Sequence, residues 1–413
     1  MKKFLKFLLI VFIWLLISVA IIGGGLIAGL ELNVSLIILG SFFSGWIAFL
    51  VIRKVVINYR AKKKVEALVS VEEPKNSTSY FNFTLANTPL KNNFISMIKL
   101  LKKSYLKVHG DPLYVLPWYL MIGKNGSGKT ELLNNANLSS PTINQNSLMN
   151  TDCGLNWCLY NQAIIIDTPG DFLATEQKPN RNVDWLELLG LLKKHRPEEP
   201  INGVIVTLSM EDLLAGNSQN LIELGIEARK NIEQLMQQLH VQVPVYVMVT
   251  HTDKLAGIEE WVSSLNRELL TSPLGEVNND GLPVLNFIHD AVSNIAERLK
   301  QLLLSAIQED NVSSSLLLLP TKLESLERHI GTFTESLFQT NPYQKTPFFR
   351  GIYFVGDGST SRHLLGGKEK GIFSHQVFTE IIPNERDMIS SLTNAEKVAK
   401  SRRIGKTLGW NII

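Results

Sequence analysis

Cysteine is scarce in this chain, because Cys153 and Cys158 are the only two among its 413 residues. Two thiols cannot form a disulfide framework, and they cannot supply the four ligands of a structural zinc site. A reducing compartment is therefore the expectation, since disulfide-rich domains belong to oxidising surroundings.

A large excess of one charge is also missing. The 41 lysines and arginines face 38 aspartates and glutamates, which leaves a formal charge of +3. A protein that mainly binds nucleic acid carries a more basic surface than this. Nucleic acid is therefore not an expected partner. The length of the chain, by contrast, allows two or three domains.

Charge is absent from two long stretches near the N-terminus, residues 7–30 and, after Glu31, residues 32–52. Each stretch can cross a lipid bilayer as a helix. Basic residues precede the first and follow the second, which predicts a transmembrane hairpin with both ends in the cytoplasm. These residues are Lys2, Lys3 and Lys6, then Arg53, Lys54, Arg60, Lys62, Lys63 and Lys64. A cleaved signal peptide is the alternative, disfavoured because the first run is too long and a second follows directly.

A glycine-rich octapeptide, GKNGSGKT, has the pattern of a phosphate-binding loop (P-loop). Glycine lets the backbone turn tightly and direct successive N–H groups at phosphate oxygens. We expect Lys129 to bridge the β- and γ-phosphates and the Thr130 hydroxyl to bind Mg²⁺. The expected nucleotide contacts are Gly123, Lys124, Asn125, Gly126, Ser127, Gly128, Lys129 and Thr130.

The sequence on either side of this loop distinguishes it from an ordinary strand-to-helix turn. A strand-like run over residues 118–122 precedes it, and residues 130–134 read as the opening of a helix. Further apolar strands alternate with helical stretches, which is typical of a mostly parallel sheet. The expected elements are strands over 163–166, 203–208 and 245–249 and a long helix over 217–240.

The strand over 163–166 ends in the sequence DTPG. Asp167 is expected to hold Mg²⁺ through water, and the Gly170 amide is expected to sense the γ-phosphate as a switch. Thr151 is our preferred switch threonine, although Thr142 fits equally well. Lys129, Asp167 and Thr151 are therefore the expected catalytic residues. Asp171 stands where a water-orienting glutamine is expected, which predicts slow hydrolysis.

The strand over 245–249 runs into the sequence THTD. In GTP-binding proteins the aspartate at this strand end accepts hydrogen bonds from guanine, so Asp253 is expected to read the base, with Thr250 beside it. The lysine that packs along the base in those proteins is His251 here, which leaves GTP and ATP both open. The alternative is a plain strand-terminal turn, because threonine and aspartate favour turns.

Four further motifs follow one another along the chain. They are PWY (Pro117, Trp118, Tyr119), RPxxPxNG (Arg196, Pro197, Pro200, Asn202, Gly203), PVYVxVT (Pro244, Val245, Tyr246, Val247, Val249, Thr250) and RGxYF (Arg350, Gly351, Tyr353, Phe354). Together with the nucleotide motifs and the hairpin, they make the chain resemble the IcmF family, called TssM in type VI secretion. The resemblance covers nearly the whole chain.

That resemblance implies a multi-pass protein of the bacterial inner membrane, in a type VI or type IVB secretion system. It implies a hetero-oligomeric complex with other membrane and baseplate proteins, and a third span followed by a periplasmic region. Here the sequence ends shortly after Arg402 and Arg403, so we expect a truncated or split form, or one without that region. A non-hydrolysing scaffold and a membrane GTPase unrelated to secretion are the alternatives.

The expected fold is α/β, with a P-loop GTPase-like, mostly parallel sheet, helices on both faces, and a helical insertion or extension. The amphipathic stretch over 94–108 is expected to pack on this domain rather than lie on anionic lipid. Residues 351–355 are expected to return as the last strand, with Gly356 and Asp357 beside the base. The expected regions are a transmembrane hairpin (1–60), a linker with an amphipathic helix (61–110), a nucleotide-binding domain (111–274), a helical region (275–345) and a returning strand with the C-terminal segment (346–413).

Overall fold

The computed structural model describes residues 88–136, 138–139, 154–173, 179–265, 267–306, 313–340, 345–356 and 371–386. Within these ranges, no helix is both long and apolar enough to cross a membrane. Several predicted features lie outside the described residues: the transmembrane hairpin, Thr142, Thr151, Asp357 and the region of the expected third span.

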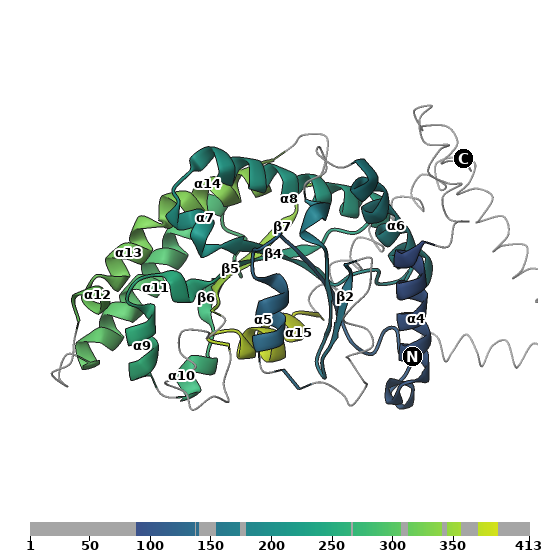
Figure 1. The fold of residues 1–413 in the computed structure, drawn as a ribbon, viewed down its shortest axis with the longest axis horizontal. Coiled ribbons are helices and arrows are strands. Elements are labelled where there is room, and N and C mark those ends of the chain that lie inside the picture. Colours follow the sequence, from purple (N-terminus) through teal and green to yellow (C-terminus); the bar gives the residue numbers. More distant parts are fainter. Residues whose placement is uncertain are drawn as a thin grey trace, which may run out of the picture. The chain divides into compact units, whose positions relative to one another are not determined.

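A seven-stranded sheet forms the centre of the described residues, with the order β2-β3-β1-β4-β5-β7-β6 (Figure 1). The inner strands are parallel, whereas the edge strands β2 and β6 run antiparallel to their neighbours. Their bounds are β1 Trp118–Ile122, β2 Asn156–Leu159, β3 Ile164–Asp167, β4 Gly203–Ser209, β5 Pro244–Thr250, β6 Leu274–Val277 and β7 Phe348–Phe354. The predicted mostly parallel sheet is therefore confirmed.

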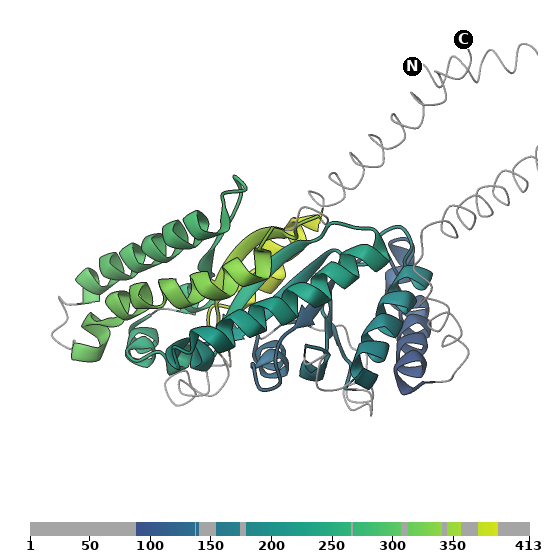
Figure 2. The same cartoon turned by 90° about the horizontal axis from the view of Figure 1, so that it is seen from above.

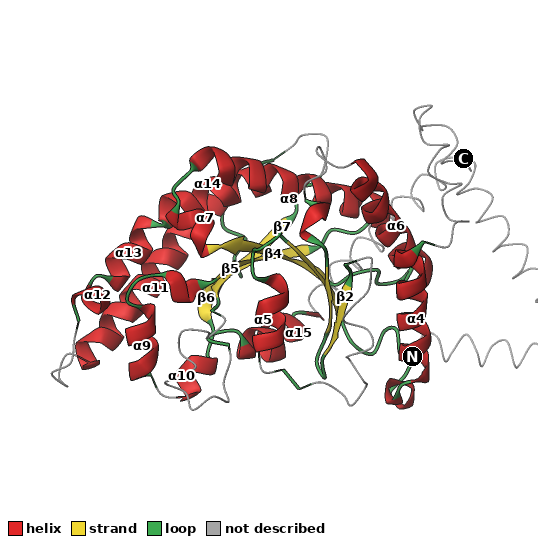
Figure 3. Cartoon of the chain, viewed as in Figure 1, coloured by secondary structure: helices red, strands yellow, loops and turns green. Residues whose placement is uncertain are grey.

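Helices cover both faces of the sheet (Figure 3). One face carries α5 (Lys129–Asn135), a π-helical turn (Val377–Ile381) and α15 (Ile382–Asn384). The other carries α4 (Pro89–Lys103), α6 (Pro179–His195), α8 (Ser218–Leu239), α11 (Val284–Ala306) and α14 (Glu327–Phe338). Alternate side chains of a strand point to opposite faces, so β1 is buried at every position and reads as a continuous apolar run.

The long helix α8 matches its prediction closely. Asn217 caps its start by accepting hydrogen bonds from the backbone N–H groups of Gln219 and Asn220. His240 ends it in a left-handed conformation, with φ of 55°. A Cβ at Gly225 would overlap the Phe333 carbonyl, so the glycine allows α8 and α14 to lie close together along the sheet (Figure 2).

Shorter helices connect these elements. They are α7 Met210–Leu214, α9 Ile258–Ser264, α10 Arg267–Thr271, α12 Ser314–Leu317 and α13 Leu319–Ser325, with 3₁₀ turns over Tyr105–Val108, Gly170–Phe172 and Thr252–Lys254. Most of the helices between β6 and β7 were expected as a helical region. The edge strand β6 was not, because a four-residue strand that contains Gly275 has little β-propensity.

The predicted return of residues 351–355 to the sheet is confirmed. Strand β7 pairs in parallel with β5, with Val247 opposite Ile352 and Val249 opposite Phe354. The boundaries of the five regions remain predictions.

The amphipathic stretch packs on the core, as expected. Helix α4 buries Phe94, Met97 and Leu101 in the same cluster as the sheet. The Phe94 ring lies 5.3 Å from that of Trp157, whose indole N–H donates to the Asn93 side chain at 2.7 Å. One face of α4 is therefore a core surface.

Two of the family motifs meet at the start of β1. The Trp118 amide donates to the Asn202 side chain at 2.8 Å, and the Asn202 amide donates to the Trp118 carbonyl at 2.8 Å. Arg196 is fully buried, with its guanidinium 4.3 Å from the centre of the Trp118 ring and 5.3 Å from that of Tyr114. Burial lowers the pKa of Arg196 to about 9, and the aromatic rings offset part of that cost by cation–π attraction.

The remaining motifs hold the last described segment on the sheet. Arg350, only 3% exposed, donates to Glu385 Oε1 at 2.8 Å, to the Asn278 carbonyl at 2.7 Å and to the Asn279 side chain at 2.8 Å. The Tyr246 hydroxyl donates to the other oxygen of Glu385. A buried, hydrogen-bonded ion pair therefore joins β5 and β7 to Glu385.

We predict that Arg350→Ala lowers the free energy of unfolding by about 3–5 kcal/mol, because it leaves the Glu385 carboxylate buried without its charged partner. Urea unfolding measures this loss. Arg298→Ala is the matched control, since Arg298 pairs with Glu276 at 2.7 Å on the exposed surface and should cost less than about 1 kcal/mol. Equal costs for the two variants would contradict the prediction.

Candidate nucleotide-binding site

The predicted P-loop connects β1 to α5. Gly126 and Gly128 adopt left-handed conformations, with φ of 78° and 71°, which side chains rarely tolerate. A Cβ at Gly123 would overlap the hydroxyl of Thr207 on β4. Glycine is therefore required at all three positions, for backbone conformation at two and for close approach at the first.

Lys129 lies inside the turn of the loop and is 6% exposed. Its ammonium donates to the carbonyls of Gly123 at 2.7 Å and Lys124 at 2.9 Å. An ammonium has three N–H donors, so one remains for a ligand in addition to these two. Burial lowers the pKa of Lys129 to about 8 although Asp167 opposes the shift, so the charge persists at neutral pH.

Thr130 and Asp167 meet at the start of α5 and the end of β3. The Thr130 hydroxyl donates to Asp167 Oδ2 at 2.6 Å, and the Asn156 amide approaches the same oxygen at 3.4 Å. Burial raises the pKa of Asp167, and its hydrogen bond from Thr130 and the charge of Lys129 oppose that shift. The predicted metal ligands are therefore neighbours.

The surroundings of the other Asp167 oxygen indicate whether a metal ion fits the site. Asp167 Oδ1 is buried and has no hydrogen-bond partner among the described residues. Such an orphaned acceptor is costly unless a cation or water binds it. Oxygen ligands from a carboxylate and a hydroxyl suit Mg²⁺, which keeps several waters and binds through few protein groups. The residues present therefore fit Mg²⁺.

These groups line a pocket of about 320 Å³, within the size range of small-molecule sites. Its walls are the loop, the start of α5, the DTPG turn and the end of β5. The lining residues are Asn125, Gly126, Ser127, Gly128, Lys129, Thr130, Glu131, Gly154, Asn156, Asp167, Thr168, Pro169, Gly170 and His251.

The DTPG turn packs directly on the P-loop. A Cβ at Gly170 would overlap the backbone and side chain of Asn125, so only glycine fits there. The Asn125 side chain donates to the Asp171 carboxylate, across the same contact. The predicted switch glycine and Asp171 therefore both contact Asn125 of the P-loop.

Thr250 holds the loop from the side of β5. Its hydroxyl donates to the Ser127 carbonyl at 2.8 Å and approaches the Leu208 carbonyl at 3.3 Å. His251 follows in a left-handed conformation, and its ring lies against Gly128, with Nδ1 3.1 Å from the Ser209 hydroxyl. The histidine thus lines the pocket in place of the expected lysine.

Asp253 lies in the 3₁₀ turn after β5 and is 9% exposed. A Cβ at Gly356 would come within 3.0 Å of its carboxylate. Two of the residues predicted to adjoin the base, Asp253 and Gly356, are therefore neighbours, although neither is among the residues that line the pocket. Recognition of the base by Asp253 stays a prediction.

Asn156 was not predicted as a site residue, and it lies opposite Asp167 in the antiparallel pair β2–β3. Gly154 and Glu131 were not predicted to line the site either, and His251 was expected only as a departure from the usual lysine. Strand β2 has four residues and was not predicted. The only available signal was an aromatic and aliphatic run, Trp157 to Leu159, shorter than most recognisable strands.

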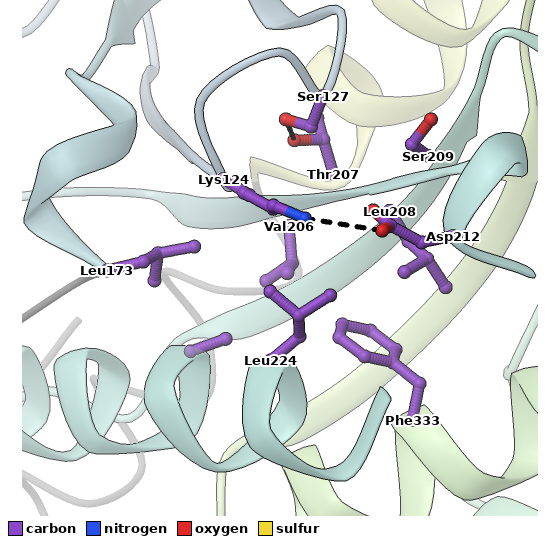
Figure 4. A pocket seen from close by; sticks show the side chains of 11 residues that line it. Lys124, Ser127, Leu173, Val206, Thr207, Leu208, Ser209, Asp212, Leu224 and Phe333 are labelled. Atoms are coloured by element: carbon purple, nitrogen blue, oxygen red, sulfur yellow. Dashed lines mark hydrogen bonds and ion pairs between the residues drawn. The ribbon is translucent and has the colours of Figure 1, made fainter. Parts of the chain in front are cut away.

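A second cavity lies beneath the loop, between β4 and α8 (Figure 4). Its volume is about 10 Å³, barely enough for one water molecule. Lys124 points across it to Asp212, at 3.3 Å, and the hydroxyls of Ser127 and Thr207 meet at 2.8 Å. The Lys124 side chain therefore points away from the pocket that holds Lys129 and Thr130, and phosphate contact by its backbone stays a prediction.

A family model described as the IcmF-related N-terminal domain matches residues 180–411, more than half of the chain. The chain belongs to the IcmF-related family. The type VI secretion system component TssM1 of Pseudomonas aeruginosa is 30% identical to this IcmF-related chain over 356 residues. The match covers 76% of this chain and 32% of TssM1, so the chain spans about a third of that relative's length.

Two solved structures are distant matches. A variant of SsGBP is 15% identical, covers 42% of this chain and 49% of its own, and has a TM-score of 0.21. A GTP-binding protein from Sulfolobus solfataricus in complex with GDP is 16% identical, covers 40% of this chain and 48% of its own, and has a TM-score of 0.17.

We predict that Asp167→Asn raises the free energy of unfolding of the metal-free protein by about 1 kcal/mol, because burial penalises the charged carboxylate. The same change should weaken Mg²⁺-dependent nucleotide binding. Urea unfolding in a chelator and nucleotide titration with and without Mg²⁺ measure the two effects. Asp290→Asn, on the exposed side of α11, should change neither. Loss of stability in Asp167→Asn would argue against a metal-ligand role.

Proposed function

We propose that this IcmF-related chain is a membrane-anchored component of a bacterial secretion system whose P-loop domain binds a magnesium nucleoside triphosphate. The observation that carries the proposal is the convergence of Lys129, Thr130 and Asp167 on one pocket beside a loop that requires glycine. Membership of the IcmF-related family supports the assignment to secretion, of type VI or type IVB.

Each group has a role in binding. The loop amides and the third N–H of Lys129 donate to phosphate oxygens, and Thr130 and Asp167 hold Mg²⁺, the second directly or through water. The metal ion neutralises charge on the β- and γ-phosphates when bound. The Gly170 amide would detect the γ-phosphate, and the packing of Gly170 on Asn125 of the loop supports this role. Thr151 is proposed to close on the metal ion as the switch threonine.

Hydrolysis is proposed to be slow. Asp171 occupies the position after the switch glycine and accepts a hydrogen bond from Asn125 at the phosphate end of the pocket. A carboxylate there repels the γ-phosphate and does not orient water as a glutamine amide does. A partner protein would then accelerate turnover. The same contact favours a second candidate, a scaffold that binds nucleotide for stability without hydrolysing it.

The anchor is proposed to be the hairpin over residues 7–52, in the bacterial inner membrane, with the nucleotide domain in the cytoplasm. This topology places the P-loop where nucleoside triphosphates are, and it follows from the basic residues on both flanks. The proposed partners are the other membrane and baseplate proteins of the secretion complex.

We predict that Lys129→Ala lowers nucleotide affinity by about 100-fold, because it removes a charge-assisted hydrogen bond to phosphate. Isothermal titration with a non-hydrolysable triphosphate measures this, with Lys322→Ala on α13 as the control that should bind normally. Unchanged affinity in Lys129→Ala would exclude this pocket. A second outcome is that the variant fails to bind nucleotide while its complex still assembles and secretes. Nucleotide would then be dispensable, and both the nucleotide-dependent component and the nucleotide-stabilised scaffold would be wrong.

We predict that Asp253→Asn changes the preferred nucleotide from GTP to xanthosine triphosphate. A carboxylate accepts hydrogen bonds from the guanine N1 and amino groups, whereas an asparagine amide donates to the carbonyl that replaces the amino group in xanthine. Competition of GTP, ATP and xanthosine triphosphate on wild type and variant measures the exchange. Equal affinity of the wild type for GTP and ATP would remove the role assigned to Asp253.

A further inference from the structure

One face of α4 and the turn that follows it is strongly basic. Residues 89–110 contain five lysines and no acidic residue. The inward face of α4 packs on the core, but the lysines from the middle of the helix onward are exposed. We define the basic patch as the exposed residues Lys99, Lys102, Lys103, Tyr105, Lys107, Val108 and Lys194.

The end of α6 belongs to the same surface. Helices α4 and α6 pack together, with the rings of Phe94 and His195 5.7 Å apart. Burial, then the charges of Lys194 and Lys102, lower the pKa of His195. Lys102 of α4 and Lys194 of α6 therefore lie near the same histidine, so both helices contribute lysines to one surface.

Two apolar side chains stand among these lysines. Tyr105 is 51% exposed and Val108 is 84% exposed, on the 3₁₀ turn just after α4. Core packing explains Phe94 and Met97 but not an exposed tyrosine and valine between lysines. Lysines around a protruding aromatic and aliphatic pair are the composition that binds the interface of an anionic bilayer.

A bilayer lies within reach of this surface if the chain is anchored as proposed above, on which this inference rests. The second uncharged run ends at Ile52, and helix α4 begins at Pro89. The 36 residues between them can span at most about 130 Å, even when fully extended. Such a tether gives a high effective concentration, so a weak surface contact is enough for docking.

We propose that the basic patch docks on anionic lipid headgroups of the bilayer that holds the anchor, with Tyr105 and Val108 in the interface. The lysines supply attraction to the headgroups, and the two apolar side chains add a short-range hydrophobic contact. Docking fixes which side of the nucleotide domain faces the membrane, so that the domain does not turn freely on its tether.

The test uses the full chain reconstituted in nanodiscs, with a nitroxide at Val108→Cys in a Cys153→Ser, Cys158→Ser background. Discs of phosphatidylglycerol mixed with phosphatidylcholine are compared with discs of phosphatidylcholine alone. In the anionic discs the label should gain contact with lipid-soluble oxygen and lose contact with a water-soluble nickel complex. A label at Leu318→Cys, an apolar site on the helical region that is 52% exposed, should report water in both.

A charge variant separates docking from non-specific effects. Lys102→Gln, Lys103→Gln and Lys107→Gln together should lower the ratio of docked to undocked protein by on the order of 100-fold, at about fivefold per lysine. The control combines Lys300→Gln, Lys322→Gln and Arg328→Gln on α11, α13 and α14, with the same change in net charge. Figure 1 shows these helices at the opposite end of the described fold from α4.

The outcomes distinguish the two proposals. A chain that leaves the discs in alkaline wash would overturn the membrane anchor. An anchored chain whose Val108 label stays in water in the anionic discs would overturn docking alone. Protection of the label that is equal in both lipids, or equal in the two charge variants, would also overturn it, because a protein contact would then cover the patch.

Discussion

The buried carboxylate of Asp167 is the constraint on which the site depends. It lies at the end of a fully buried strand, with one oxygen held by Thr130 and the other without a hydrogen bond among the described residues. Such a group is costly in an empty pocket and favourable beside a cation. The charge of Lys129 offsets part of that cost. Under the proposed function, stability in the metal-free state and affinity for a metal-bound nucleotide are therefore opposed at this residue.

The family motifs that do not contact the pocket hold the surrounding sheet together. Trp118 and Asn202 exchange backbone and side-chain hydrogen bonds where β1 and β4 begin, and Arg350 fixes Glu385 against β5 and β7. The Tyr119 hydroxyl adds a bond of 2.7 Å to the Ile382 carbonyl. These contacts join the strands that carry the P-loop and the turn Thr252–Lys254 to the last described segment.

Much of the fold was predictable because its signals are local. Parallel strands buried on both faces give continuous apolar runs, and α8 begins at a capping asparagine and ends one residue before the left-handed His240. Edge strands lack such signals. Strands β2 and β6 are each four residues long, and β6 pairs with β7, which is distant in sequence. Strand β2 pairs with the neighbouring strand β3, but it is too short to be recognised, so Asn156 was missed although it lies opposite Asp167.

The sequence by itself determined the conformation of the P-loop, because the glycine spacing expresses a local backbone conformation and Lys129 and Thr130 supply its side-chain donors. It also determined the family, through motifs in a fixed order. Only the tertiary structure decided what those motifs contact: Thr250 bonds to the loop carbonyl of Ser127, and Asp171 bonds to Asn125. It also decided that one face of α4 is core while its lysines remain on the surface. The physical reason is that such contacts join segments far apart in the chain, and their partners are chosen by packing rather than by local sequence.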